Sequence, residues 1–382
     1  MNEFYFDNSA TTRAYDSVVS VVCDAMLNDY GNPSSSHRKG LEAEKRVRTA
    51  REEIARFAGV LPKEVLFTSG GTESNNTAIF GVCHLMRHRG RKILTLKTEH
   101  PSVLRCVEQL EKDGYEVCYI PVDAYGRPDL ATLETMLTSD TVLISCAHVN
   151  SELGTVTPVA EIRKLLKRHK CPALFHIDGV QSFAREGFKE AVAAGDLISF
   201  SGHKIHGPKG VGGLIVKNGI KLPPRNFGGG QEQGLRSGTE NVPGILGLAE
   251  ACRIWQEEGV EKMAHIRTLR ETLESALNER IPALQCNSPE DGAPYILNCS
   301  FPGTKSEVII RLLEQEGIFV SPGSACSSKS GAISHVLMAV GMEKKRADSA
   351  IRFSLSDTNT LDEIAPVADG VAKAVSFMTK GK

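Results

Sequence analysis

Lys204 stands in an unusual setting for a lysine. It lies between two histidines in SFSGHKIHGPKG, residues 199–210, directly after the apolar run DLISF and before a second apolar run, VGGLIV. A surface lysine usually occupies the polar face of a helix, whereas this one follows a predicted buried strand. We therefore treat its amine as a candidate reactive group.

A second candidate group is the stretch SGGT, residues 69–72, between a predicted strand and a predicted helix. Gly70 and Gly71 allow a ligand to approach the backbone, and Thr72 with the amides of a helix N-terminus can bind a phosphate. Ser201 and His203 follow another predicted strand and could donate to the same anion. The alternative is a tight turn in which a hydroxyl caps the helix.

Asp178 ends an apolar run, where an unpaired carboxylate is costly to bury. It could cap a helix or pair with an arginine. It could also face a protonated ring nitrogen, as in pyridoxal phosphate sites, where an aspartate keeps the pyridinium charged. Such a site needs a reactive lysine, a phosphate cup and a carboxylate. Lys204, the SGGT stretch and Asp178 supply one of each.

Two further side chains fit this interpretation. His100, in TEHPS, could stack on the cofactor ring and move protons, or could simply cap a helix or lie at the surface. Gln181, three residues after Asp178, could reach the phenolic oxygen of the cofactor.

The C-terminal third contains a thiol and a guanidinium in unusual settings. Cys326 lies among small residues in SPGSACSS, where a cysteine is either exposed and used or of no consequence. Arg352 falls inside the apolar run AIRFSLS, where it needs an anion. That anion could be a substrate carboxylate held by two hydrogen bonds or a structural carboxylate.

The elements that must position these residues alternate between short apolar runs and helical patterns from about residue 60 to 220. This pattern predicts parallel βαβ units around a central sheet. Ligands bind at the carboxyl ends of such strands. Five successive predicted strands end in polar or glycine-rich segments, which read SGGTES, KTEH, NSELG, DGVQ and SGHK.

After a glycine-rich stretch and a long predicted helix, the alternation resumes on a smaller scale. The sequence therefore predicts an α/β protein with two domains. We expect a large cofactor-binding domain over residues 13–250. We expect a small α/β domain from residues 1–12 and 251–382, carrying the Cys326 loop.

Composition argues against several classes of protein. With 45 Lys and Arg against 46 Asp and Glu, the formal net charge is −1, which gives no electrostatic reason to expect nucleic acid or an acidic membrane as partner. The first residues, MNEFYFDNSATT, lack the features of a signal peptide, and no apolar run has membrane-spanning length. The ten scattered cysteines show no metal-ligand spacing, so we expect a cytoplasmic protein with reduced thiols and no metal site.

Ten motifs, in this order, extend the argument over nearly the whole chain: DNSATT, GNPSSSH, TSGGTES, TEH, HVNSELG, HIDGVQ, SGHKIHGPKG, RSGTEN, SPGSACSS and IRFSLS. Together they resemble the cysteine desulfurases of the NifS and IscS type, which are pyridoxal-phosphate enzymes of the class V aminotransferase group. The resemblance implies the aspartate-aminotransferase-like fold (PLP fold type I) and a homodimer with sites at the subunit interface.

The resemblance also implies a role for each matching residue. Lys204 resembles the Schiff-base lysine, Asp178 the pyridinium partner, His100 the stacking residue and Cys326 the nucleophile. Arg352, with Asn150, would hold the substrate. The phosphate ligands would be Gly71, Thr72, Ser201 and His203, joined by Thr239 from the neighbouring subunit.

One motif departs from the family pattern. Where the family often reads HVNNEIG, this chain reads HVNSELG, so Ser151 replaces an asparagine that contacts the phenolic oxygen of the cofactor. Serine is shorter, which leaves Gln181 or a water to share that contact.

The implied reaction converts L-cysteine to L-alanine and leaves the sulfur as a persulfide on Cys326, for transfer to an acceptor protein in iron-sulfur cluster assembly or thiolation. Two alternatives use the same scaffold, a selenocysteine lyase and another class V aminotransferase-type enzyme. A more remote alternative is a non-catalytic scaffold protein for sulfur transfer.

Overall fold

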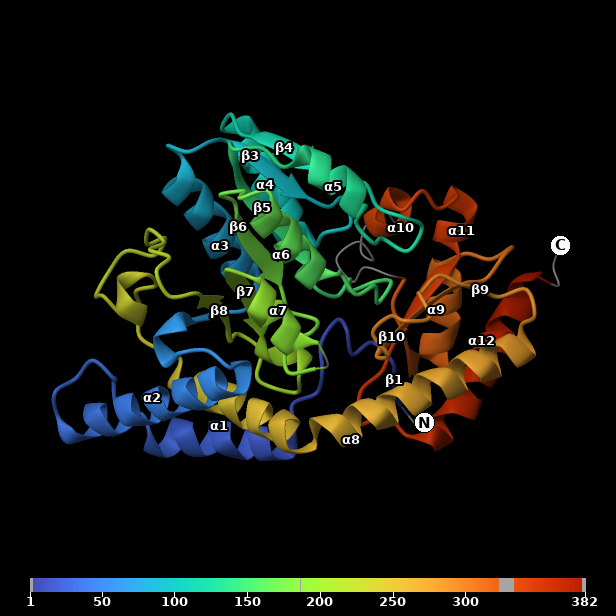
Figure 1. Ribbon diagram of the computed structural model, residues 1–382. Helices are drawn as coiled ribbons and strands as arrows, with labels where there is room; N and C mark the ends of the chain where they lie inside the picture. The colour runs from blue at the N-terminus through green and yellow to red at the C-terminus, as the bar shows by residue number, and fades with distance from the viewer. Residues whose placement is uncertain (1–2, 186, 323–332, 380–382) are drawn as a thin grey trace.

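The computed structural model describes residues 3–185, 187–322 and 333–379. Its centre is a seven-stranded sheet (Figure 1). The strands are β2 (Val65–Thr68), β3 (Lys92–Thr95), β4 (Glu116–Tyr119), β5 (Thr141–Ala147), β6 (Leu174–Asp178), β7 (Leu197–Ser201) and β8 (Gly212–Val216). Their spatial order is β2-β8-β7-β6-β5-β3-β4, and only β8 runs antiparallel to its neighbours. The prediction of an α/β protein with a mostly parallel central sheet is confirmed.

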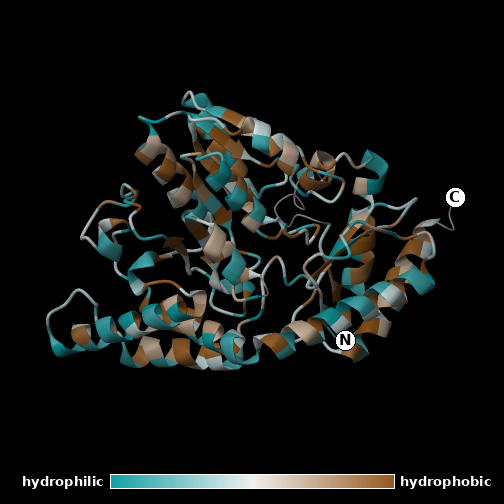
Figure 2. Cartoon of the chain, in the orientation of Figure 1, coloured by the Kyte–Doolittle hydropathy of each residue, from teal (hydrophilic) through white to brown (hydrophobic). Residues whose placement is uncertain are grey.

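Helices cover both faces of this sheet because its strands are apolar on both sides. Helices α3 (Gly71–Met86) and α4 (Pro101–Lys112) pack on one face, where Leu143 points. Helices α6 (Val159–Arg168) and α7 (Phe188–Ala194) pack on the other, where the next residue, Ile144, points. Figure 2 shows the hydrophobic strands at the centre and hydrophilic residues on the outer helices.

The C-terminal part forms two smaller sheets. Strands β9 (Gln285–Cys286), β10 (Ile296–Ser300) and β12 (Ala350–Ser354) form an antiparallel sheet with β10 in the middle. Strand β1 (Phe4–Tyr5) pairs in parallel with β11 (Ile318–Phe319), which brings the start of the chain beside this region (Figure 1). The remaining helices here are α9 (Ser306–Gln315), α10 (His335–Ala339), α11 (Lys344–Asp348) and α12 (Ile364–Thr379).

Helix α8 (Val242–Arg280) connects the two parts of the molecule. Its first half packs against α1 (Asp16–Asn28) and α2 (Arg38–Ala58), and its later part reaches α12. The predicted domain boundary at residue 250 lies inside this continuous helix, and the boundary stays a prediction. Helix α5 (Leu130–Met136) is capped by the preceding residue, Asp129, whose side chain accepts hydrogen bonds from the amides of Ala131 and Thr132. Within residues 3–379, apart from the undescribed stretches, no helix combines the length and apolar character needed to cross a membrane.

The register of the strands brings the predicted polar ends together. Ala147, Asp178 and Ser199 lie side by side on β5, β6 and β7. A short 3-10 turn, Gly202–Lys204, follows β7 directly, so the lysine lies at the same edge. The chain therefore gathers segments from residue 147 to residue 204 at one edge of the sheet.

Candidate active site

A cavity of about 320 Å³ lies at this edge of the sheet. It contains ten of the predicted site residues: Gly71, Thr72, His100, Asn150, Ser151, Asp178, Gln181, His203, Lys204 and Arg352. Ser201 lines an adjoining hollow that shares Gly71, Thr72 and His203 with the cavity. Thr239 is exposed and lines neither. Cys326 lies outside the described residues.

Lys204 enters the cavity with its amine held by backbone oxygens. Its Nζ donates to the carbonyl of Ser9 at 2.5 Å and to that of Ala10 at 2.8 Å. Burial, together with the positive charges of Arg352 and Arg185, lowers the pKa of Lys204 to about 7. A substantial fraction of the amine is therefore neutral near pH 7, and a neutral amine is the nucleophilic form.

The carboxylate of Asp178 is fixed from two sides. Its Oδ2 accepts a hydrogen bond of 2.7 Å from Asn75 on α3, and its Oδ1 accepts one of 3.0 Å from the amide of Val180. Asp178 is only 6% exposed, yet it lines the cavity. These two structural contacts coexist with a position from which the carboxylate can face a ligand.

His100 likewise has a structural contact as well as a place in the cavity. Its Nδ1 accepts a hydrogen bond of 3.1 Å from the amide of Ser102 and so caps α4. Burial lowers the pKa of His100, while the nearby charge of Asp178 raises it and that of Lys204 lowers it. The cap fixes the orientation of the ring at the cavity wall.

The beginning of α3 has the features of an anion site. Gly70 has φ of 146°, a conformation that side-chain-bearing residues rarely adopt, and no side chain caps the helix there. The first amides of a helix lack intrahelical acceptors. The Oγ of Ser201 is buried beside them without a partner among the described residues. Burial and nearby lysines lower the pKa of His203 to about 4, so it stays neutral at pH 7.

Arg352 lies on β12 and is 2% exposed. Its guanidinium donates to Asp7 at 2.7 Å and to the carbonyl of Ser151 at 2.8 Å, whereas its Nε has no partner among the described residues. The structural ion pair that we considered is therefore present. One donor group of this buried cation remains for another acceptor.

Three other predicted residues differ in how much of their side chain is free. Gln181 donates to the carbonyl of Ser9 at 3.0 Å, and its buried Oε1 has no partner among the described residues. Asn150 uses both ends of its amide on backbone groups, including the carbonyl of Thr98. Ser151 lines the cavity, and its carbonyl binds Arg352.

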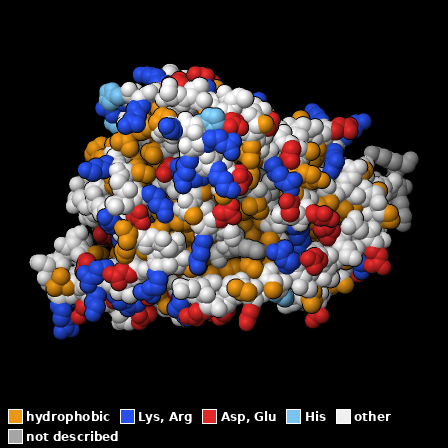
Figure 3. Space-filling model, viewed as in Figure 1, with side chains coloured by type: hydrophobic (Ala, Val, Ile, Leu, Met, Phe, Trp, Pro, Cys, Tyr) orange, Lys and Arg blue, Asp and Glu red, His pale blue; other side chains and the backbone are white. Residues whose placement is uncertain are grey.

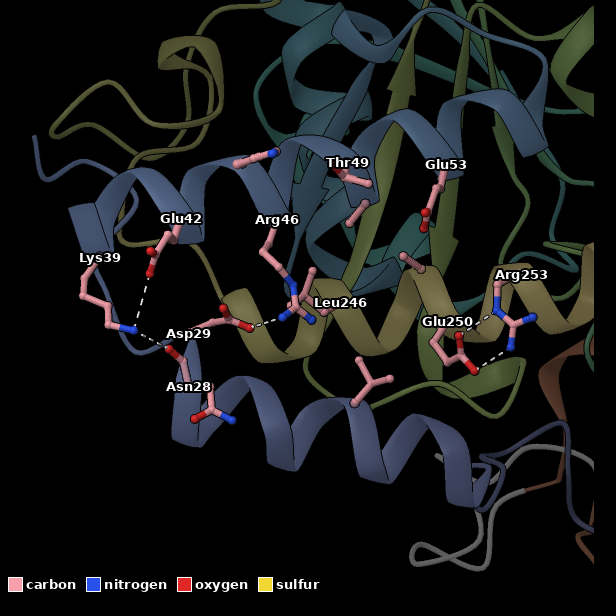
Figure 4. A pocket seen from close by; sticks show the side chains of 14 residues that line it. Asn28, Asp29, Lys39, Glu42, Arg46, Thr49, Glu53, Leu246, Glu250 and Arg253 are labelled. Carbon is pink, nitrogen blue, oxygen red and sulfur yellow. Dashed lines mark hydrogen bonds and ion pairs between the residues drawn. The ribbon is translucent and has the colours of Figure 1, made fainter. Parts of the chain in front are cut away.

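A larger hollow of about 650 Å³ lies between α1, α2 and α8 (Figure 4). Its charged groups mostly bind each other, as Arg46 does with Asp29 at 2.6 Å and Arg253 with Glu250 at 2.8 Å. On the face shown in Figure 3, acidic and basic side chains are intermixed. Volume alone therefore does not identify the site. We place it at Lys204, where three buried polar atoms, Ser201 Oγ, Gln181 Oε1 and Arg352 Nε, have no hydrogen-bond partner among the described residues.

Sequence reasoning missed residues that line the cavity or hold the side chains lining it. Asn75, which holds Asp178, lies four positions after Gly71 and therefore on the same helix face, a spacing that could have identified it. Asp7 occurs in the DNSATT motif, but its pairing with Arg352 spans 345 residues. The sequence contains no local signal for such a contact.

Comparison with known proteins agrees with this geometry. The family model described as aminotransferase class-V matches residues 4–367. The cysteine desulfurase IscS of Klebsiella pneumoniae is 41% identical over 376 residues, covering 97% of this chain and 92% of that protein. A cysteine desulfurase of Nostoc sp. is 39% identical over 383 residues, covering 98% and 93%.

A solved structure gives the same result. A structure titled NifS-like protein superposes with a TM-score of 0.93 at 38% identity, covering 98% of this chain and all of the other. The predicted aspartate-aminotransferase-like fold is therefore confirmed. Since the family model spans nearly all of the sequence and relatives of about 40% identity align along its full length, the chain belongs to the class V aminotransferase family.

Proposed function

We propose that this protein is a pyridoxal-phosphate-dependent cysteine desulfurase that converts L-cysteine to L-alanine and passes the sulfur to an acceptor protein. The observation that carries the proposal is the buried Lys204 amine, which lies in one cavity with Asp178 and Arg352 and has a pKa lowered to about 7. Cysteine desulfurases among the relatives support the choice of reaction.

The residues present fit the cofactor. Two buried atoms without partners among the described residues lie where the phosphate and the phenolic oxygen of the cofactor would bind: Ser201 Oγ beside the start of α3, and Gln181 Oε1 in the cavity. The glycines at 70 and 71 leave the start of α3 open to an anion. A Cβ added to Gly71 would lie 2.5 Å from Val180, which shows how closely this turn is packed.

We assign the phosphate to Gly71, Thr72, Ser201 and His203, the ring nitrogen to Asp178, and the ring face to His100. When bound, the cofactor supplies an electron sink that stabilises negative charge developing at the substrate α-carbon. The carboxylate of Asp178 stays in place because Asn75 holds it.

The chain's own groups then act on the substrate. Arg352 binds the substrate carboxylate through its remaining donor and orients the α-carbon. The Nζ of Lys204 takes the α-proton, because a pKa near 7 allows it both to accept and to return a proton. The thiolate of Cys326 attacks the substrate sulfur. The carbon–sulfur bond breaks, Cys326 keeps the sulfur as a persulfide, and the remaining carbon skeleton is protonated to alanine.

Single-turnover incubation of the cofactor-loaded protein with L-cysteine tests this proposal. We expect alanine release and a mass increase of one sulfur atom on the peptide containing Cys326. In Cys326→Ala neither should occur. Cys23→Ala is the matched control, because Cys23 is exposed on α1 and does not line the cavity.

Equal alanine release from Cys326→Ala and the unmodified protein would contradict the assignment of Cys326. Faster turnover of selenocysteine in both proteins, without a sulfur adduct, would instead favour a selenocysteine lyase.

We also propose that the protein is a homodimer in which Thr239 contributes to the partner's site. Thr239 is exposed and lies away from the cavity of its own chain. Mixing Thr239→Val chains with Lys204→Ala chains tests this. In a mixed dimer, the chain with Thr239→Val keeps its own Lys204, and its Lys204→Ala partner supplies an unmodified Thr239. If the sites are shared in this way, the site containing that Lys204 should be active. Equal cofactor affinity in Thr239→Val and the unmodified protein would contradict the proposal.

A further inference from the structure

Cys286 and Cys299 form a pair of thiols away from the cavity. Cys286 lies on the edge strand β9, and Cys299 lies directly opposite it on the central strand β10. The thiol of Cys286 donates to the carbonyl of Ser288 at 3.5 Å, and Cys299 lies opposite it in the strand register. Cys299 is fully buried, whereas Cys286 is partly accessible.

The register of the two strands gives this pair a favourable geometry. The amide of Asn287 donates to the carbonyl of Asn298 at 2.8 Å, so those two residues form the hydrogen-bonded pair of the ladder. The neighbouring pair, Cys286 and Cys299, is then the non-hydrogen-bonded kind, in which Cα atoms lie about 4.5 Å apart and side chains approach closely. That separation falls within the range of about 4.4–6.8 Å that a disulfide requires.

Side chains beside the pair hold this register in place. Asn287 donates its side-chain amide to Asn298 Oδ1 and to Ser300 Oγ, each at 2.8 Å. The guanidinium of Arg346 donates to Asn287 Oδ1 at 2.7 Å and to the carbonyl of Cys286 at 3.2 Å. The two thiols therefore cannot separate by a simple slip of the edge strand.

The two thiols differ in reactivity. The neighbouring Cys299 thiol lowers the pKa of Cys286, whereas burial and Glu274 raise it, and the net direction is down. The Cys286 thiol and burial raise the pKa of Cys299 well above its ordinary value. Glu274 and Arg270, both on α8, are the charged groups that act on the pair. Cys286 thus resembles an attacking thiolate and Cys299 the thiol that resolves it.

We propose that Cys286 and Cys299 are a redox modification site that takes a hydroperoxide as its oxidant and closes to a cross-strand disulfide. The Cys286 thiolate attacks the peroxide, the oxygen–oxygen bond breaks, and Cys286 becomes a sulfenic acid as an alcohol or water leaves. The sulfur of Cys299 then attacks the sulfur of Cys286. A disulfide forms, and the hydroxyl group leaves as water with the proton of Cys299.

The site is tested by treating full-length Cys326→Ala protein with stoichiometric hydrogen peroxide. This variant lacks the thiol that is proposed to carry the persulfide, so that thiol cannot react with the peroxide. We expect the loss of two free thiols per chain and a dithiothreitol-reversible link between the peptides containing Cys286 and Cys299. In Cys286→Ser at the same dose, neither change should occur. Cys118→Ser is the matched control, since Cys118 is also partly accessible, and it should still form the link.

Two outcomes would overturn the proposal. One is oxidation of Cys286 that proceeds to sulfinic acid without a link to Cys299. The other is thiol loss that is unchanged in Cys286→Ser. Neither depends on catalytic activity, so failure here is distinguishable from failure of the desulfurase assignment.

Discussion

Asp357 contacts three other segments of the chain through Tyr15, Lys262 and His206. Its buried carboxylate accepts hydrogen bonds from Tyr15 Oη at 2.8 Å and from Lys262 Nζ at 2.5 Å, and it lies 3.2 Å from His206 Nε2. His206 follows Lys204 by two residues, and its ring stacks on that of Tyr15. Replacing Asp357 with asparagine keeps the shape of the side chain but removes the charge.

The expected cost of Asp357→Asn follows from this burial. Removing one partner of a buried ion pair destabilises a protein by about 3–5 kcal/mol, because the remaining charge loses its counterion. The Asp357 side chain is 5% exposed and that of Lys262 16%. An asparagine oxygen can still accept one hydrogen bond. We therefore expect the free energy of unfolding to fall by about 3 kcal/mol at pH 7.

The cost should depend on pH. Burial alone would raise the pKa of Asp357, but hydrogen bonds and charge from His206, Lys262 and Tyr15 outweigh burial and lower it. A carboxylate with a depressed folded-state pKa contributes stability fully above its unfolded-state pKa of about 3.9 and loses that contribution as the pH falls below it. The difference between Asp357→Asn and the unmodified protein should therefore be constant from pH 7 to about 5 and shrink below about pH 4.

Urea unfolding followed by the fluorescence of Trp255, the single tryptophan and a buried one, measures this difference between pH 7 and pH 3. Asp16→Asn is the control, because the ion pair of Asp16 with Arg13 is exposed and should contribute little. Equal unfolding midpoints for Asp357→Asn and the unmodified protein at pH 7 would refute the reasoning. A difference that persisted unchanged at pH 3 would refute the electrostatic part of it.

Three other substitutions test separate steps. Arg352→Gln should raise KM for L-cysteine about 10- to 100-fold, since a charge-assisted hydrogen bond contributes about 1.5–3 kcal/mol; an unchanged KM in steady-state kinetics would count against a substrate contact. Arg185→Met should raise the pKa of Lys204 from about 7, because the positive charge of Arg185 disfavours the protonated amine; the pH dependence of Lys204 acylation in cofactor-free protein measures this. Gly213→Ala should destabilise the sheet by about 1–3 kcal/mol, because the added Cβ would lie 2.3 Å from the ring of Phe200; an unchanged melting temperature would contradict this.

Much of the fold could be predicted from local patterns. Short β-branched runs such as TVLISCA became strands, and the polar residues after five of them met at one edge because parallel strands share their direction. Lys204, Asp178 and His100 were found as candidates in this way, and all three line the cavity. The same local patterns also allowed purely structural roles. Two of these contacts are present: His100 caps α4, and Arg352 pairs with Asp7.

The rest of the site depends on contacts that no local pattern encodes. Arg185 is an example: its sequence context, QSFAREG, resembles an exposed turn, yet it is 7% exposed. It donates to the carbonyl of Lys204 at 2.6 Å, and its guanidinium lies over the ring of Tyr295 at 4.1 Å. Among the described residues Arg185 forms no ion pair. Aromatic rings and backbone carbonyl oxygens contact its guanidinium instead. Only the folded chain brings those groups together.

The segment from residue 7 to 12 explains how such distant residues form one site. Asp7 holds Arg352, the carbonyls of Ser9 and Ala10 hold the amine of Lys204, and Thr12 accepts a hydrogen bond of 2.8 Å from the amide of His206. These contacts span between 194 and 345 residues of sequence. Because this one segment contacts both the turn after β7 and strand β12, a shift of the segment would displace Lys204 and Arg352 together. The short polar stretch near the start of the chain therefore sets the geometry of the site as much as the residues that carry out the chemistry.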